Sequence, residues 1–264
     1  MADLTNSNRF SPRTNMSKRQ MTIKCAQLNL QHSRTATYNL TQLILQNNID
    51  VAFVQEPYTV LNNVAGFPKS LRIFAHGVGR KRSAIIINNN IDAIAIRQLS
   101  NEDATLLELR HGDYNFYGAS LCFPIDRDIE RDIESIGKII QLTKGKGIII
   151  SIDSNSRSKL WCDKTTNQRG KSLEEFILTH DLFLMNEATD TPTFETMRGR
   201  SWIDLTLCDN ALVQKISWWT CGEEESCADH KIIFFNISAE RNGGTAIYYP
   251  GKRYLMKTGE WGIL

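Results

Sequence analysis

Apolar segments of strand length recur along most of this chain, and only a few segments carry the spacing of an amphipathic helix. Some neighbouring strands are separated by a short turn, such as His111-Gly112-Asp113, and others by a helical segment. Many strands, few helices and both kinds of connection exclude a simple alternation of strand and helix. The pattern predicts two mixed β-sheets packed face to face, with helices on their outer surfaces.

The expected helices have apolar residues at intervals of three and four. The clearest apolar stripe follows Pro124 and consists of Ile129, Ile133, Ile136 and Ile140. Two further helices are predicted over 36–47 and 172–180. The other apolar segments predict strands at 21–29, 51–54, 71–76, 83–88, 93–97, 104–111, 114–122, 148–152, 182–185, 202–208, 212–219 and 231–237.

Length and composition limit the class of protein. The chain has 264 residues, of which 41% are hydrophobic and 23% charged, as in globular proteins with one large domain or two small ones. No apolar run reaches the roughly 18–20 residues of a membrane helix. The polar N-terminus has no apolar core of a secretory signal. We therefore expect an intracellular protein that does not bind membranes.

The positive charge is concentrated at the N-terminus. The first 20 residues contain four basic residues and one acidic residue, whereas the remaining 244 contain 27 basic and 28 acidic residues. We predict a disordered basic tail over 1–20, a folded domain over 21–238 and an irregular linker or extension over 239–264. Because the charge of the domain is balanced, any contact with nucleic acid must come from a local patch.

Polar residues capable of metal binding or acid–base chemistry accompany the apolar strands at five places. An ionised carboxylate within or beside an apolar strand is unfavourable unless it is paired or bound to a cation. Five such places predict that the side chains converge on one site. They are Asn29, Glu56, the Asp153–Asn155 segment, Asp204 and the Asp229-His230 pair.

Four of the five places also have a plainer explanation. Asp153 and Asn155 could form an Asx turn, and Glu56 could end a loop. Asp204 could lie on a polar face of its sheet, and His230 alone is more often a structural histidine than a catalyst. All of these explanations would have to hold together to exclude a shared site.

Carboxylate and amide oxygens prefer Mg²⁺ or Mn²⁺ to zinc, and none of the six cysteines forms a C-x-x-C pair. A divalent cation of this kind neutralises charge on a phosphoryl group, and an acid or a histidine positions the attacking water. The residue types therefore predict a divalent-metal-dependent phosphodiesterase.

In their order along the chain, the five places resemble the motifs of the exonuclease III-like endonuclease/exonuclease/phosphatase family. The segments Leu28–Leu30, Gln55–Pro57, Asp153–Asn155, Ser201–Leu205 and Ala228–His230 carry the resemblance. Features such as Asn167, Arg169-Gly170 and Pro192–Phe194 are similar to the endonuclease domain of non-LTR retrotransposons. The resemblance covers 21–237 and implies a four-layer αββα sandwich. It also implies a nuclear enzyme that nicks chromosomal DNA, so that the freed 3′-OH primes reverse transcription.

The resemblance implies a role for each candidate residue. Glu56 would be the main metal ligand for Mg²⁺ or Mn²⁺, Asn29 would lie beside it, and Asp229 would complete the carboxylates near the metal. Asp153 would activate the attacking water, and Asn155 would hold Asp153 and the phosphate. Asp204 would hold the imidazole of His230, which would contact the scissile phosphate.

Two departures from the family affect the expected activity and partners. Cys122 stands where the family has a tyrosine, and Tyr117, an odd number of residues earlier, should face the other side of the sheet. Nothing in the chain resembles a polymerase, although retrotransposon proteins of this type continue into a reverse transcriptase. We expect a DNA-binding protein that is monomeric or, in its parent element, fused to a reverse transcriptase.

Candidate DNA contacts come from cations in the expected loops, and each could instead be solvated surface charge. They are Arg34, Arg80, Lys81, Arg82, Arg157 and Lys159. Two other functions remain open from the sequence: a phosphoesterase of the same superfamily that acts on abasic DNA or on phospholipids, and an inactive DNA-binding relic of a retroelement.

Overall fold

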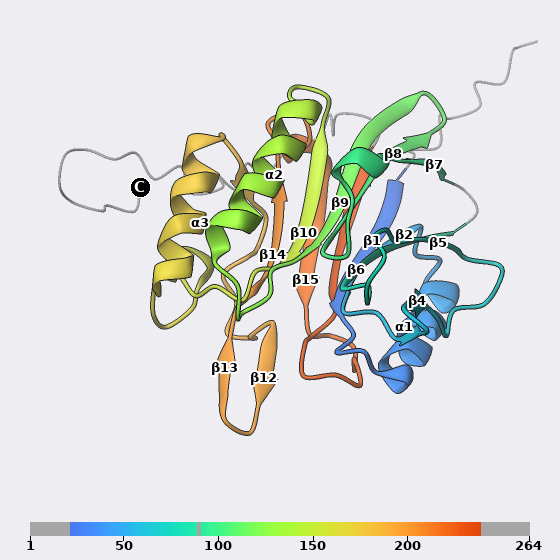
Figure 1. The fold of residues 1–264 in the computed structure, drawn as a ribbon, viewed down its shortest axis with the longest axis horizontal. Helices are drawn as coiled ribbons and strands as arrows, with labels where there is room; N and C mark the ends of the chain where they lie inside the picture. Colours follow the sequence, from blue (N-terminus) through green and yellow to red (C-terminus); the bar gives the residue numbers. More distant parts are fainter. Residues whose placement is uncertain (1–21, 89–90, 239–264) are drawn as a thin grey trace, which may run out of the picture.

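A computed structural model describes residues 22–88 and 91–238, so the tail predicted over 1–20 and the extension predicted over 239–264 lie outside the described residues. Two six-stranded mixed sheets pack face to face between outer helices, which confirms the predicted αββα architecture (Figure 1).

The first sheet joins the beginning and the end of the described chain. Its strand order is β15-β16-β1-β2-β6-β5, and only β1 and β2 run parallel. In that order the strands span Ile216–Cys221, Ile233–Ser238, Thr22–Asn29, Val51–Gln55, Ser83–Ile87 and Arg72–Phe74.

The second sheet has the order β11-β14-β10-β9-β8-β7, and only β9 and β10 run parallel. In that order its strands span Phe183–Leu184, Asp204–Cys208, Ile148–Asp153, Tyr114–Cys122, Ala104–His111 and Asp92–Ala95. The predicted hairpin around Gly112 is thus confirmed as β8 and β9.

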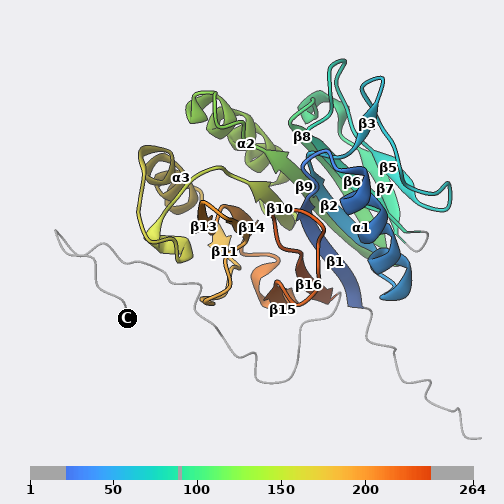
Figure 2. The ribbon, with the colours of Figure 1, turned by 90° about the horizontal axis from the view of Figure 1, so that it is seen from below.

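Helices cover the outer faces of both sheets. Helix α1 (Arg34–Gln46) packs on the first sheet, whereas α2 (Ile129–Thr143) and α3 (Gln168–Thr179) pack on the second (Figure 2). The remaining elements are two small ribbons and three short 3₁₀ helices. They are β3 (Thr59–Val60) with β4 (Asn63–Val64), β12 (Phe194–Thr196) with β13 (Gly199–Ser201), η1 (Arg97–Leu99), η2 (Lys159–Trp161) and η3 (Val213–Lys215).

Three buried hydrophobic clusters fill the spaces between the four layers. One lies between the second sheet and α2 and α3, one between the two sheets, and one between the first sheet and α1. Ile129 and Ile136 of the predicted stripe are buried in the first of these clusters, with Ile133 and Ile140 packed against it. The helix periodicity therefore identified the packed face of α2 correctly.

One predicted strand is partly wrong. The segment 212–219 begins with the 3₁₀ helix η3 and becomes strand β15 only at Ile216. The N–H groups of Leu212 and Val213 both donate to the carbonyl of Asp209, and these bonds coil the chain before the strand begins. An apolar run alone does not reveal such a turn.

The side chains that face the space between the sheets change from apolar to polar along each central strand. Phe53 gives way to Gln55 on β2, Ile149 to Ser151 and Asp153 on β10, and Cys208 to Thr206 on β14. One end of the space between the sheets is therefore an apolar core, and the other is a buried polar layer that ends in the candidate site.

Candidate active site

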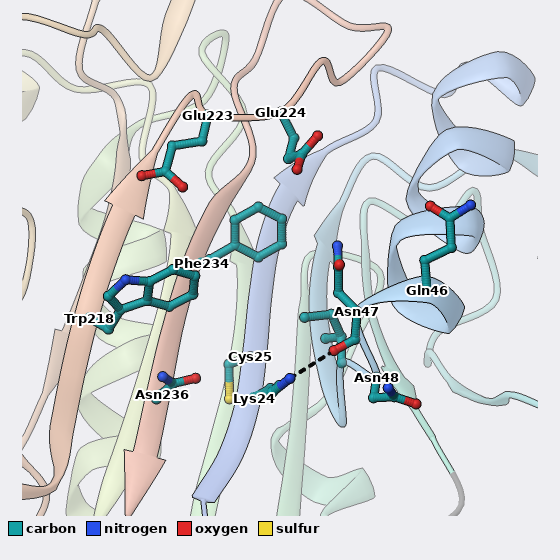
Figure 3. A pocket seen from close by; sticks show the side chains of 11 residues that line it. Lys24, Cys25, Gln46, Asn47, Asn48, Trp218, Glu223, Glu224, Phe234 and Asn236 are labelled. Atoms are coloured by element: carbon teal, nitrogen blue, oxygen red, sulfur yellow. Dashed lines mark hydrogen bonds between the residues drawn. The ribbon is translucent and has the colours of Figure 1, made fainter.

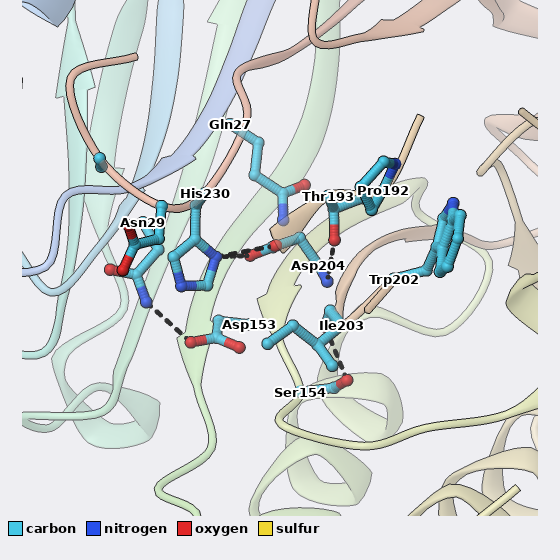
Figure 4. Close-up of polar contacts among 12 residues, drawn as sticks. Gln27, Asn29, Asp153, Ser154, Pro192, Thr193, Trp202, Ile203, Asp204 and His230 are labelled. Carbon is cyan, nitrogen blue, oxygen red and sulfur yellow. Dashed lines mark hydrogen bonds and ion pairs between the residues drawn. The ribbon is translucent and has the colours of Figure 1, made fainter. Parts of the chain in front are cut away.

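The polar ends of strands from both sheets meet at one edge of the sandwich. Asp153 of β10 is the register partner of Asp204 of β14, within the second sheet. From the first sheet, the amide Nδ2 of Asn29 donates a 2.7 Å hydrogen bond to Oδ2 of Asp153 (Figure 4). The site therefore exists only where the two sheets pack together.

Asp204 and His230 form a buried pair. Nδ1 of His230 lies 2.9 Å from Oδ2 and 3.1 Å from Oδ1 of Asp204. The Asp204 backbone N–H donates to Oγ1 of Thr193 at 3.0 Å, and the ring of Phe194 packs against the imidazole at 4.7 Å between centroids. Thr193 and the first residue of β12, Phe194, thus fix the two members of the pair.

Asn155 turns back towards Asp153. Its φ angle of 45° places it in the left-handed region, which asparagine tolerates better than most residues. In this conformation its backbone N–H lies 3.3 Å from Oδ1 of Asp153, and its Nδ2 lies 3.4 Å from Oδ2. The same Nδ2 donates to the carbonyl of Phe123 at 3.1 Å. Two donors of Asn155 therefore stabilise negative charge on Asp153.

Glu56 directly follows β2 and is held by its backbone. Its N–H donates to the carbonyl of Arg82 at 2.9 Å, and its carbonyl accepts from the N–H of His32 at 2.7 Å. The side chain is half-buried, and no hydrogen bond or ion pair joins its carboxylate to the described residues. Glu56 therefore presents an unpaired carboxylate at the rim of the buried cluster.

Asp229 lies outside the buried cluster. It is exposed, its carboxylate accepts from Nε2 of Gln31 at 3.0 Å, and the N–H of Gln31 donates to Oδ1 of Asn29 at 2.8 Å. Of the seven residues predicted for the catalytic and metal positions, six lie in or beside the cluster, and Asp229 reaches it through Gln31.

Burial and neighbouring charges shift two pKa values at the site. Burial and the negative charge of Asp204 raise the pKa of Asp153 to about 7, although His230 and Asn29 oppose this shift. Burial by itself lowers the pKa of His230, but the charge and hydrogen bond of Asp204, with Asp153 and Glu56, outweigh it and raise the pKa to about 9. At neutral pH the imidazole is thus positively charged, and Asp153 is poised between its two protonation states.

The donor set fits a hard divalent cation. Asp153, Asp204 and His230 offer ligand atoms within 4.8 Å of one another, but a protonated imidazole bonded to Asp204 has no free lone pair for a metal. Glu56, with its unpaired carboxylate, and the Asn29 carboxamide oxygen are better ligands, because oxygen donors suit Mg²⁺ or Mn²⁺. A cation there would also relieve the repulsion between Glu56 and Asp153.

A buried polar layer supports the site from within the sandwich. Gln27 donates to the carbonyl of Ile152 at 3.3 Å and accepts from the Thr206 hydroxyl at 3.0 Å, which in turn accepts from the Trp219 indole at 3.0 Å. Gln55 bridges to Ser120 at 3.0 Å. This layer was not predicted from the sequence. Its signal is a polar residue close to a site residue on the same strand: Gln27 stands two positions before Asn29, and Thr206 two positions after Asp204.

The candidate DNA-binding cations fall into two groups. Arg34, Arg80, Arg157 and Lys159 are exposed. Lys81 is buried and donates to the carbonyls of Gly77 and Gly79, both at 2.8 Å, and Arg82 is paired with Asp103. The placement of these last two side chains indicates a structural role, because their charges are already bonded within the protein.

Cys122 lies at the site, and Tyr117 does not. Asp153 and Glu56 lie close enough to Cys122 for their charges to act with burial in raising the pKa of its thiol well above the usual value. Tyr117 packs against the cluster under α2 and α3, and its hydroxyl lies 3.5 Å from Glu108. The prediction that Tyr117 faces away from the site is confirmed.

A separate hollow of about 630 Å³ lies on the outer face of the first sheet, beside the end of α1 (Figure 3). It is lined by Trp218, Phe234, Glu223 and Glu224 among others, and none of the candidate site residues borders it. The residues that line the hollow include no histidine.

Comparisons of sequence identify relatives among retrotransposons. The profile of the endonuclease-reverse transcriptase family matches residues 116–234. A 115 kDa protein of the type-1 retrotransposable element R1DM of Drosophila melanogaster is 23% identical over 217 residues, or 78% of this chain and 21% of that protein. The Pol polyprotein of the element R1 of Bradysia coprophila is 24% identical over 212 residues, or 75% and 21%. The chain thus spans about a fifth of the length of these relatives.

Solved structures share the fold. The endonuclease domain of TRAS1, a telomere-specific non-LTR retrotransposon, superposes with a TM-score of 0.75 at 28% identity, over 81% of this chain and 98% of that domain. The AP endonuclease of Leishmania major gives 0.66 at 10% identity, over 82% and 88%, and shares the fold alone. No helix within 22–88 and 91–238 has the length and apolar character needed to cross a membrane.

Proposed function

Because this chain belongs to the endonuclease/exonuclease/phosphatase family, among the endonuclease domains of non-LTR retrotransposons, we propose that it nicks DNA by metal-dependent hydrolysis of a phosphodiester bond. The observation that carries the proposal is the buried Asp204–His230 pair beside an Asp153 carboxylate held by Asn29 and Asn155. These groups provide a base, a cationic donor and amide donors within one small space.

Each residue has a role that follows from its protonation state and contacts. Asp153, with a pKa near neutrality, accepts a proton from the attacking water. His230, held as imidazolium by Asp204, donates a hydrogen bond to a phosphoryl oxygen as negative charge develops there. Asn155 has a side-chain amide beside Asp153 and contributes a neutral donor at the same place.

Glu56 and Asn29 would hold Mg²⁺ or Mn²⁺, with the exposed Asp229 as an outer carboxylate linked through Gln31. The cation, when bound, would neutralise charge on the phosphate. Cys122 offers no hydroxyl to the phosphate. We expect the loss of that hydrogen bond to slow the reaction rather than abolish it, because each of the other donors remains.

The proposed substrate is DNA. The chain would act on it in the nucleus, as one domain of a longer retroelement protein. The ribbon β12–β13 projects from the body of the molecule (Figure 1). It begins beside the site, since Phe194 of β12 forms a β-bridge with His230. The tip of this ribbon exposes Met197 and Arg198, which suits insertion into a groove of the duplex.

A plasmid-nicking assay tests the proposal. We expect the chain to convert supercoiled plasmid to the open circle with Mg²⁺ or Mn²⁺ and to stop in EDTA. Glu56→Ala should lose at least about 100-fold in rate, because it removes a ligand and a charge from the site. Lys138→Ala, an exposed change on α2, is the control. Undiminished nicking in EDTA would refute the metal assignment, and no nicking by a folded wild-type chain would support an inactive relic.

A further inference from the structure

Residues in and just before the first turn of α3 form hydrogen bonds with the turn that follows Asp153. We propose that Arg169 is a positioning residue of the active site, which acts by holding the Ser154–Asn155 peptide, and that Asn167 and Gly170 allow it to do so. The proposal rests on the nuclease function proposed above, because it concerns the same site.

Three nitrogens of Arg169 bind main-chain carbonyls. Nη2 donates to Ser154 and Nε to Asn155, both at 3.2 Å, and Nη1 donates to Arg127 at 2.6 Å. The carbonyl groups come from two separate segments, one after Asp153 and one between β9 and α2. A guanidinium engaged in this way is directed at the protein rather than at a phosphate.

The bond to Ser154 acts directly on Asp153. A peptide group is planar, so fixing the carbonyl of Ser154 also fixes the direction of the N–H of Asn155. That N–H lies 3.3 Å from Oδ1 of Asp153, and the Asn155 side chain lies 3.4 Å from Oδ2. Arg169 therefore holds Asn155 in its left-handed conformation, with both donors over the carboxylate.

Asn167 and Gly170 hold the backbone of Arg157, further along the turn, against the start of α3. The N–H of Arg157 donates to Oδ1 of Asn167 at 3.1 Å, and the N–H of Asn167 donates back to the carbonyl of Arg157 at 3.0 Å. A Cβ atom on Gly170 would lie 1.9 Å from that carbonyl oxygen, so only glycine permits the approach. The Asn167–Gly170 segment thus holds the turn against the first turn of α3, and Asn167 also caps that helix by accepting from the N–H of Gly170 at 2.7 Å.

Loss of Arg169 should affect the chemical step and not the binding of DNA. We expect Arg169→Ala to lower kcat about 10–100-fold, as for residues that orient a metal-site or catalytic group, with KM for DNA unchanged. The kcat of Arg169→Lys should lie between those of wild type and Arg169→Ala, because one ammonium group cannot reach all three carbonyl groups. Lys171→Ala is the charge-matched control, since this exposed lysine on the same helix end makes no bond to the turn.

Single-turnover nicking and hydrogen exchange of the amides in 154–157 together test the proposal. Faster exchange and lower kcat in Arg169→Ala, with Lys171→Ala like wild type, would support it. Unchanged exchange would overturn it, and so would weaker DNA binding with a salt slope reduced by about one, which marks a phosphate contact. If the wild-type chain does not nick DNA, the proposed nuclease function is refuted. Hydrogen exchange alone then tests whether Arg169 holds the turn. If Arg169→Ala does not fold, Arg169→Lys is measured instead.

Discussion

The protonation of two side chains sets the pH range in which the site can act. Burial and Asp204 raise the pKa of Asp153 to about 7, and the neighbouring carboxylates hold the pKa of His230 at about 9 despite its burial. The nicking rate should therefore rise as pH increases through about 7 and fall as it increases through about 9. A cation bound beside Glu56 and Asp153 would lower both pKa values, because these carboxylates also raise the pKa of His230, and would move both limits to more acidic pH. Measurement of kcat across this range checks the prediction.

The Asp204→Asn variant tests the cause of the two pKa shifts. The negative charge of Asp204 raises the pKa of both Asp153 and His230, so removal of this charge should move both limbs of the pH profile to lower pH, whatever the absolute rate. Limbs that stay in place would show that other groups titrate in the profile.

Asp204 and His230 should act as one unit. The histidine can donate to the phosphate only while Asp204 holds its ring and its charge. We expect Asp204→Asn and His230→Ala each to slow single-turnover nicking by at least about 100-fold, and the double variant to be little slower than either. Circular dichroism of each variant controls for folding. Multiplicative losses, or a near-normal rate in either single variant, would remove the pair from the mechanism.

Replacement of two helical glycines by alanine should change the free energy of unfolding in opposite directions. In α2, a Cβ on Gly137 would meet only the Phe176 ring at 3.8 Å, so Gly137→Ala should stabilise the fold by about 0.5–1 kcal/mol through helix propensity. In α3, Gly170→Ala should destabilise it by about 1–3 kcal/mol, because the new methyl group collides with the Arg157 carbonyl. Urea denaturation of both variants measures the difference. Stabilisation by Gly170→Ala would mean that the turn moves aside freely.

The elements of the fold were largely predictable, because periodicity records which face of an element is buried. The isoleucines of α2 and the hairpin around Gly112 show this. The start of α3 was predicted four residues late, since its first turn is polar and is specified by the Asn167 cap instead. The segment before Ile216 was predicted as a strand, because local apolar content does not encode the η3 turn.

The convergence of the candidate residues was predictable, but the contacts that support them were not. Asp153, Asp204 and His230 stand out in sequence because charged residues interrupt or border apolar strands. The role of Arg169 depends on a contact between the start of α3 and the end of β10, and its partners are main-chain carbonyls that carry no sequence signal. For the same reason the sequence could not show that Lys81 is bonded internally while Arg80 is exposed.

On the scale of the whole molecule, Mg²⁺ should stabilise the fold more at alkaline pH. The pKa of Asp153 is about 7 in the folded state against an ordinary 3.8, so its ionisation destabilises the fold progressively between about pH 4 and 7. The pKa of His230 is about 9 against 6.5, so its stabilisation is complete below about 6.5 and is lost as pH rises through 9. A cation beside Asp153 offsets the first of these effects.

The corresponding measurement is the melting temperature with and without Mg²⁺ at about pH 5.5 and 8. At 100 times its Kd, the cation should add about 2.7 kcal/mol. The increase in melting temperature should be larger at pH 8, and Glu56→Ala should abolish it at both values. An equal increase in wild type and variant would indicate that Mg²⁺ binds elsewhere.

The order of strands in the first sheet also has a consequence for synthesis of the protein. Strand β1 is flanked by β2 and by β16, so one of its edges stays open until the ribosome has produced residues 233–238. His230 lies three residues before the start of β16, and Asp204 and Asp153 lie in the other sheet. A nascent chain therefore carries no complete set of catalytic groups until nearly the whole domain has emerged. Under the proposed function, a fragment that ends before His230 lacks the imidazole of the buried pair and should not nick DNA.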